Sequence, residues 1–291
     1  MSVRGTDWAE LLAHATEKVQ RSVSEIAAGR NRRLVVGTGA AGDKTLLADR
    51  KAEEELLSAL FRVEGLRVLS EEAGNKGDAK ADLVAVVDPL DGSSNFERGI
   101  PFYCTSVAIA DGGSLTELSH ALVRDLVTGD VYYAEKGKGA RKNGRVIRTA
   151  KTADLSNAVL GIDISKANRE TIAGLERVIG TGKQQVHYGA NALELCYLAD
   201  GRIDASIDIR GRMRVTDFAG GYLIAKEAGA VFSSDDEGEL DIPLDLDARF
   251  GFVASANRTV HRQILERLSL TRGRNTARPA LGKNSRAPTP S

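Results

Sequence analysis

Hydrophobic residues near the beginning of the chain recur at helical spacing. The apolar positions of this segment are Trp8, Leu11, Leu12, Ala15 and Val19. They share one face of a helix, so the pattern predicts an amphipathic helix over residues 7–28. A second helix is predicted over residues 47–62. Between the two helices, Gly37 to Gly42 contains three glycines, which predicts a mobile loop.

Short apolar runs in the first half of the chain are typical of strands. They cover residues 66–70, 83–87, 103–110, 121–124, 130–134 and 146–148. Asn143-Gly144, between the last two runs, is a strong signal for a hairpin turn. Residues 1–150 are therefore expected to form an α+β subdomain, in which helices cover a largely antiparallel sheet.

In the second half of the chain, strand and helix patterns alternate. The expected strands are 158–164, 185–188, 205–209, 231–233 and 252–255, and the expected helices are 168–179, 190–199, 216–228 and 258–268. This alternation is typical of an α/β arrangement, so residues 151–271 are expected to form a second subdomain. Residues 272–291 are rich in Arg, Pro, Gly and Ser and predict a disordered tail.

Composition and charge exclude several classes of protein. The 291 residues carry 40 basic and 40 acidic side chains, which gives no basis for binding a nucleic acid or a membrane surface through net charge. No apolar run approaches the roughly 20 residues of a membrane span. Cys104 and Cys196 both lie in apolar runs, so we expect buried free thiols and a cytoplasmic protein.

Residues suited to binding a metal or a phosphate are most concentrated at residues 88–96, Asp-Pro-Leu-Asp-Gly-Ser-Ser-Asn-Phe. An apolar strand runs directly into Asp88, and Asp91 follows three positions later, so the two carboxylates repel each other unless a cation lies between them. Gly92 allows a ligand to approach the backbone closely. Ser93 is suited to the beginning of a helix, whose free N–H groups bind phosphate. The alternative is a plain Asx turn between a strand and a helix.

Three other acidic positions strengthen the metal hypothesis. Glu71-Glu72 ends the strand that precedes the Asp88 strand, and the two strand ends would meet if these strands were parallel neighbours. Asp217 opens an apolar helix, where a simple N-cap is the alternative, and Asp49, taken alone, would be an exposed surface acid. Mg²⁺ prefers carboxylate, carbonyl and water oxygens. Two such ions can activate a water for in-line attack on a phosphate.

These residues resemble the signatures of the inositol monophosphatase superfamily. Residues 88–96 match in full its first signature, Asp-Pro-(Ile/Leu)-Asp-Gly-(Ser/Thr)-x-Asn-Phe, and Glu71-Glu72 matches its upstream acidic pair. Its second signature, Trp-Asp-x-Ala-(Ala/Gly)-Gly, corresponds to residues 216–221, where Thr216 replaces the Trp. Two further family motifs correspond to Gly137 to Gly144 and to Gly189 to Cys196, so the resemblance spans roughly residues 8–268. It implies a layered αβαβα sandwich that combines α+β and α/β halves.

The resemblance implies a role for each residue of the motifs. The implied metal ligands are Glu71, Asp88, Leu90 through its carbonyl, Asp91 and Asp217. Asp49 with Ser93 would orient and deprotonate the attacking water, and the backbone N–H groups of Gly92 and Ser93 would hold the phosphate. The implied cofactor is two or three Mg²⁺ ions, for which Mn²⁺ is expected to substitute. Residues 37–46 would close over the site and help to hold the third ion.

The implied substrate contacts lie mainly in the second half of the chain. They are Asp91, Tyr188, Gly189, Ala190, Asp208 and Arg210. Alternation over residues 204–210 places Asp208 and Arg210 together on the polar face of a half-buried strand. This Asp-x-Arg, with the Trp of the second signature replaced, resembles archaeal members that hydrolyse both fructose 1,6-bisphosphate and inositol 1-phosphate. The alternative is a surface ion pair between Asp208 and Arg210.

The resemblance thus implies a Mg²⁺-dependent phosphoric monoester hydrolase of carbohydrate metabolism, with a place in gluconeogenesis. Its expected substrates are fructose 1,6-bisphosphate and inositol 1-phosphate. A strict inositol monophosphatase and a nucleotide 3′-phosphatase remain open, as does a non-catalytic regulatory protein on the same fold. We expect a homodimer or higher homo-oligomer, with no nucleic-acid or membrane partner.

Overall fold

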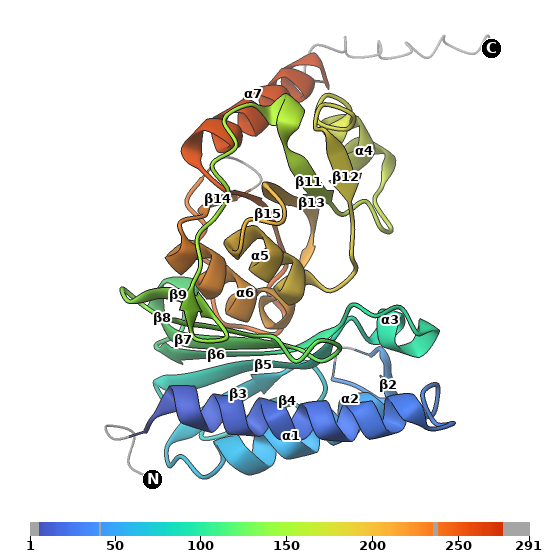
Figure 1. The fold of residues 1–291 in the computed structure, drawn as a ribbon, viewed down its shortest axis with the longest axis vertical. Coiled ribbons are helices and arrows are strands. Elements are labelled where there is room, and N and C mark those ends of the chain that lie inside the picture. Colours follow the sequence, from blue (N-terminus) through green and yellow to red (C-terminus); the bar gives the residue numbers. More distant parts are fainter. Residues whose placement is uncertain (1–5, 41, 235–237, 276–291) are drawn as a thin grey trace, which may run out of the picture.

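The helices and sheets of the protein alternate in five layers (Figure 1). The computed structural model describes residues 6–40, 42–234 and 238–275. From one side to the other, the layers are α1 with α2, an eight-stranded sheet, α5 with α6, a five-stranded sheet, and α4 with α7. This arrangement confirms the αβαβα sandwich implied by the family resemblance.

The helices follow the predicted positions, except that the helix predicted over 168–179 ends at residue 175. They are α1 (Trp8–Ala28), α2 (Leu47–Leu60), α3 (Ser93–Arg98), α4 (Arg169–Leu175), α5 (Asn191–Ala199), α6 (Val215–Ala228) and α7 (Arg258–Asn275), with 3₁₀ turns at Leu115–Glu117 and Leu155–Asn157. Helix α7 runs further than predicted, so residues 272–275 of the expected tail are helical. The rest of that tail, residues 276–291, lies outside the described residues.

The eight-stranded sheet has the order β10-β9-β8-β7-β6-β5-β3-β4 and is antiparallel except between β3 and β5. Its strands are β3 (Leu66–Ser70), β4 (Gly74–Gly77), β5 (Leu83–Asp91), β6 (Cys104–Asp111), β7 (Leu118–Asp125), β8 (Val131–Glu135), β9 (Gly139–Lys142) and β10 (Arg145–Val146). The sequence pattern missed β4 and β9, because glycines and charged residues dominate both. The Asn143-Gly144 turn therefore joins β9 to β10, rather than the two strands first expected.

Strand β5 is buried on both faces, which explains its unbroken apolar sequence. Leu83, Ala85 and Val87 pack into the core under α1 and α2, while Val84 and Val86 face the core shared with α5 and α6. The strand continues to Asp91, beyond its predicted end at Val87. Two apolar cores thus hold β5 rigidly, and its acidic end is fixed with it.

The five-stranded sheet has the order β12-β11-β13-β15-β14. Its strands are β11 (Val159–Ile162), β12 (Gln184–Val186), β13 (Ala205–Met213), β14 (Val231–Ser234) and β15 (Phe250–Ser255). Strand β11 runs parallel to β12 and β13, while β15 runs antiparallel to β13 and β14. All strands of this sheet follow residue 158, whereas those of the larger sheet precede residue 147.

Helix α6 lies in the central layer and contacts both α5 and the larger sheet. A Cβ atom at Gly221 would lie 2.7 Å from the carbonyl oxygen of Ala192, so the close packing of α5 on α6 requires a glycine there. This packing sets the position of α6, and with it the position of the Asp217 side chain above the sheet.

The glycine-rich segment after α1 forms a hairpin rather than a free loop. Strands β1 (Val35–Thr38) and β2 (Lys44–Leu46) pair antiparallel. The amide of Gly39 donates to the carbonyl of Asp43 (2.9 Å), and the amide of Ala40 donates to the carbonyl of Glu72 (2.9 Å). The turn is therefore attached to the segment that follows β3.

Two expectations from composition can be compared with the described residues. Cys104 and Cys196 are both buried and free, as predicted. None of the described helices combines the length and the apolar character needed to cross a bilayer.

Candidate active site

Three carboxylates from separate elements meet at one place. Among the described residues, Glu71, Asp88 and Asp217 each offer a carboxylate oxygen, and these oxygens lie within 4.8 Å of one another. Glu71 follows β3 and Asp88 lies in β5, and the parallel pairing of these strands sets Ser70 opposite Val87. Helix α6 adds Asp217 from its first turn. The two strands are parallel neighbours, so the condition under which their acidic ends would meet is fulfilled.

Burial and mutual repulsion make this cluster costly to ionise. Asp88 is 1% exposed, and its pKa lies well above the usual value because of burial and the neighbouring Glu71. Burial, followed by the charge of Asp217, raises the pKa of Glu71 in the same way. In the described part of the chain, no Lys, Arg or His forms an ion pair with Asp88 or Asp217. An all-oxygen donor set of three carboxylates, of which only Glu71 pairs with a basic side chain among the described residues, fits a hard divalent cation such as Mg²⁺.

Leu90 and Asp91 extend the site along the end of β5. The amide of Ala192, in the first turn of α5, donates to Oδ2 of Asp91 (2.7 Å). Burial and the charge of Asp217 raise the pKa of Asp91 to about 7. The Leu90 carbonyl accepts the hydroxyl of Ser93 (2.8 Å). Asp91 lies outside the group of three close carboxylates but lines the same cavity.

Asp49 is buried, so its interpretation as an exposed surface acid is wrong. The side chain is 1% exposed, and its Oδ2 accepts the amide of Leu46 (2.6 Å). Its Oδ1 has no hydrogen-bond partner among the described residues. Burial raises the pKa of Asp49 to about 7, although the nearby Ser93 hydroxyl acts to lower it. A buried carboxylate oxygen beside Ser93 is suited to accept a proton from a water molecule.

Gly92 turns the chain from β5 into α3. Its φ of 90° lies in the left-handed region, and a Cβ atom there would lie 3.0 Å from both Ala190 Cβ and the Phe102 carbonyl oxygen. Glycine is therefore required by conformation and by space. Gly92 and Ser93 line a cavity of about 480 Å³ together with the acidic cluster, as their implied phosphate-binding role requires.

A larger cavity of about 790 Å³ adjoins the acidic one. The two cavities share Asp43, Ser94, Lys166, Gly189, Asn191, Arg214 and Asp217. Tyr188 and Gly189 line the larger cavity, in agreement with a substrate contact. Ala190 does not, because it is fully buried in the apolar core at the beginning of α5. Its place in the fold suits packing against Gly92 rather than contact with a substrate.

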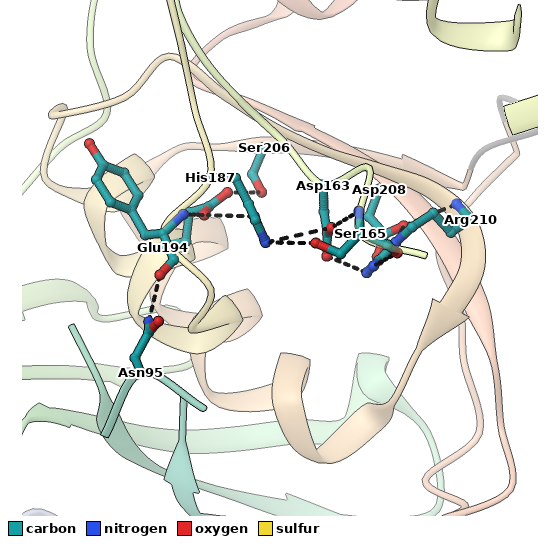
Figure 2. A network of polar contacts seen from close by, with 9 residues as sticks. Asn95, Asp163, Ser165, His187, Glu194, Ser206, Asp208 and Arg210 are labelled. Atoms are coloured by element: carbon teal, nitrogen blue, oxygen red, sulfur yellow. Dashed lines mark hydrogen bonds and ion pairs between the residues drawn. The ribbon is translucent and has the colours of Figure 1, made fainter. Parts of the chain in front are cut away.

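Arg210 lies in the wall of the larger cavity, within a network of polar contacts (Figure 2). Its Nε and Nη2 donate to the two carboxylate oxygens of Asp208 (2.8 and 2.7 Å), and Nη1 donates to the carbonyl of Ser165 (2.8 Å). Nη2 also pairs with Asp163. Asp208 is 2% exposed, so the two residues do not form a surface pair. Asp208 holds Arg210 in place and does not itself line the cavity.

The network continues from Asp163 toward the acidic motif (Figure 2). His187 Nε2 lies 3.5 Å from Asp163 Oδ1, and His187 Nδ1 lies 3.9 Å from Glu194 Oε2. Glu194 accepts the amide of Tyr188 (3.1 Å), whose carbonyl accepts the side chain of Asn95 (2.6 Å). Asn95 belongs to the 88–96 motif, so this network connects that motif to the wall that holds Arg210.

The sequence did not predict several residues that line the two cavities. They are Asp163, Lys166, His187, Asn191 and Arg214, whereas Asp43 belongs to the 37–46 segment that was expected to close over the site. Most come from connections between elements, where periodicity carries no signal. Asn191 is the exception, because it is the first residue of α5. Arg214 lies between β13 and α6, three positions before Asp217, within the segment that already departs from the family signature.

Comparison with known proteins agrees with the geometry of the site. Residues 7–271 match the sequence profile of the inositol monophosphatase family. The chain is 34% identical to a fructose-1,6-bisphosphatase/inositol-1-monophosphatase of Methanothermobacter thermautotrophicus over 90% of this chain and 97% of that protein. It is 29% identical to a bifunctional NADP phosphatase/NAD kinase of Methanococcus maripaludis, over 89% of this chain but only 49% of that protein.

A solved structure shares the whole fold. It is described as an inositol monophosphatase-fructose 1,6 bisphosphatase and superposes with a TM-score of 0.80 at 30% identity. The match covers 90% of this chain and 99% of that chain. The layered fold is therefore common to this chain and to a protein named as a phosphatase.

Proposed function

The chain belongs to the inositol monophosphatase family, and from this premise we propose that it is a Mg²⁺-dependent phosphatase of fructose 1,6-bisphosphate and inositol 1-phosphate. Family membership and the names of its relatives indicate a phosphatase of small phosphorylated molecules. The observation that carries the metal-dependent chemistry is the meeting of Glu71, Asp88 and Asp217 beside the 88–96 motif, while the choice of the two substrates rests on the name of the relative.

Each residue of the site has a chemical task in this proposal. Bound Mg²⁺ would supply charge neutralisation and polarisation of the phosphate oxygens. Glu71, Asp88 and Asp217 would hold the ions, and Asp91 with the Leu90 carbonyl would complete the set. Asp49, supported by Ser93, would accept a proton from the attacking water, because a pKa near neutrality suits a general base. The N–H groups of Gly92 and Ser93 would hold the phosphate.

The size and charge of the larger cavity support a substrate with a second phosphate. Its volume is about 790 Å³, and its wall presents Lys166, Arg210 and Arg212. A nucleotide substrate is the second candidate, because a relative over 89% of this chain is named as an NADP phosphatase. A strict inositol monophosphatase would make little use of this basic wall, since inositol 1-phosphate carries a single phosphate.

Phosphate release from a panel of substrates tests the proposal directly. The panel contains fructose 1,6-bisphosphate, inositol 1-phosphate, adenosine 3′,5′-bisphosphate and NADP⁺, each with Mg²⁺. We expect turnover of the first two at the highest kcat/KM. A preference for either nucleotide would favour the second candidate. Release from none of the four would favour the non-catalytic alternative.

Arg210 is expected to matter more for a bisphosphate than for a monophosphate. Removing a charge-assisted donor costs about 1.5–3 kcal/mol, so Arg210→Ala should lower kcat/KM for fructose 1,6-bisphosphate by roughly 10- to 150-fold. The loss of kcat/KM should be reinforced because Asp163, which lines the cavity, would then face the second phosphate without its Arg210 partner. Inositol 1-phosphate serves as the internal control. An equal fall in kcat/KM for both substrates would show that Arg210 only maintains the structure of the cavity wall.

Three broader features stay predictions. We propose two subdomains, residues 1–150 and 151–271, because each sheet draws all its strands from one side of the boundary. A homodimer or higher homo-oligomer follows from the family resemblance and is measurable by sedimentation. A cytoplasmic setting agrees with the two free, buried cysteines.

A further inference from the structure

Arg214 places a fixed positive charge at the edge of the acidic cluster. It precedes α6 as its N-cap residue, and its side chain lines both cavities. Its Nη1 donates to Oε1 of Glu71 at 2.8 Å. Glu71, Asp88 and Asp217 form the acidic cluster. Among the described residues, the pair between Arg214 and Glu71 is the only ion pair that this cluster makes with a basic side chain.

The other arm of the same guanidinium reaches the β1–β2 hairpin. Nη2 of Arg214 donates to Oδ2 of Asp43 at 2.8 Å. Asp43 closes the hairpin turn, since its carbonyl accepts the amide of Gly39 (2.9 Å). The hairpin is also attached to Glu72, which accepts the Ala40 amide through its carbonyl and the Thr45 hydroxyl through its carboxylate. One planar side chain thus connects a proposed metal ligand to the turn beside the site.

Arg214 and an incoming divalent cation compete for the same carboxylate and repel each other. A guanidinium that donates to a carboxylate oxygen reduces the negative charge which that oxygen offers to a metal ion. It also repels a divalent cation at short range in a partly buried site, where the effective dielectric constant is well below that of water. Arg214 keeps only 24% of its side chain exposed and Glu71 only 22%, so solvent screens the pair weakly.

We propose that Arg214 is the resident counter-cation of the metal site. It stabilises Glu71 when no divalent cation is bound, competes with that cation for the carboxylate, and fastens the β1–β2 hairpin through Asp43. This inference rests on the proposed metal site. It assigns to Arg214 a positioning role that the motifs of the sequence do not contain.

Metal affinity is the measurement that tests the competition. Metal-free protein is titrated with MnCl₂ and with MgCl₂ by calorimetry. Arg214→Gln, which keeps a polar side chain without the charge, should bind either cation roughly ten-fold more tightly than the wild type. Arg214→Lys keeps the charge but not the planar fork, so its affinity should stay closer to that of the wild type. The metal-free Arg214→Gln protein should melt at a lower temperature, because Glu71 has lost its partner.

Arg212→Gln is the matched control. Arg212 lies two positions earlier, lines the larger cavity, and forms no hydrogen bond or ion pair among the described residues. It should leave metal affinity close to the wild-type value. An equal gain in affinity in the Arg212 and Arg214 variants would show a general charge effect and overturn the specific role of Arg214. Unchanged or weaker binding in Arg214→Gln would overturn the competition itself.

Hydrogen exchange at the Gly39 and Ala40 amides tests the second part of the proposal. Both Arg214→Gln and Asp43→Asn should accelerate exchange in the metal-free protein, whereas Arg212→Gln should not. Protection equal to the wild type in both variants would overturn the fastening role. Failure of the proposed function would look different, because the wild type itself would then bind neither cation and release no phosphate.

Discussion

Asp49→Asn is expected to lower kcat by roughly 10²- to 10⁴-fold, the usual contribution of a general base, in a protein that still folds and binds Mg²⁺. The structure supports this because Asp49 is buried, and one of its carboxylate oxygens has no hydrogen-bond partner among the described residues. Asn keeps an oxygen that can accept the Leu46 amide, so the beginning of α2 should be preserved. What Asn lacks is the ability to accept a proton from water.

The pH dependence of stability gives a second signature of Asp49. Burial raises its pKa to about 7 from the ordinary value of 3.8. The folded protein therefore holds a proton that the unfolded chain has lost between these values. The contribution of protonated Asp49 to the stability of the fold is therefore complete below about pH 4 and is lost as the pH rises through about 7. In the metal-free protein, Asp49→Asn should reduce this loss, which thermal unfolding at pH 4 and pH 8 measures.

Glu54→Gln on the same helix is the control for Asp49→Asn. Glu54 is exposed and pairs with Lys51, so neither activity nor the pH profile should change. The assignment of Asp49 as general base would be refuted if Asp49→Asn kept kcat within a few-fold of the wild type. A loss of Mg²⁺ binding equal to the loss of activity would instead make Asp49 part of the metal site.

Asp217→Asn is expected to abolish metal binding and to lower activity by more than about 100-fold. Removing a residue that only hydrogen-bonds to a metal ligand already lowers metal affinity or activity by about 10- to 100-fold, and Asp217 is proposed as a ligand itself. Wild-type protein in excess chelator should show the same loss. Asp217 belongs to the close group of carboxylates, and burial raises its pKa although Arg214 acts to lower it. Asn keeps the side-chain size and an oxygen for the Thr216 hydroxyl.

The same substitution should not weaken the metal-free fold. Asn removes one negative charge from a buried group of three, so the remaining carboxylates repel each other less. The melting temperature without metal should therefore stay unchanged or rise slightly at neutral pH, while the added stabilisation by Mg²⁺ disappears. Asp111→Asn, at an exposed strand end, is the control and should retain both metal response and turnover. Wild-type turnover in Asp217→Asn, or full activity in chelator, would contradict the assigned metal site.

Local sequence patterns predicted most of the elements, and their failures have clear causes. The helix at 47–62 and the strand at 83–87 were found because local apolar patterns mark them, the strand by an unbroken apolar run, and both exist as α2 and β5. Strand β4, Gly-Asn-Lys-Gly, has no apolar side chain and is held by its pairing with β3. The end of α7 was missed because residues 272–275 are polar and include a glycine.

The sequence by itself determined the chemistry of the 88–96 motif and the kind of ligand it offers. This was possible because the motif is continuous, so its Asp88, Asp91 and Gly92 act within a single strand-to-helix connection. The tertiary structure alone decided what surrounds it. Arg214 reaches Glu71 across 143 positions of sequence, and the parallel pairing of β3 with β5 decides which carboxylates meet. Such contacts depend on how layers pack, and packing is a property of the whole core that no local pattern records.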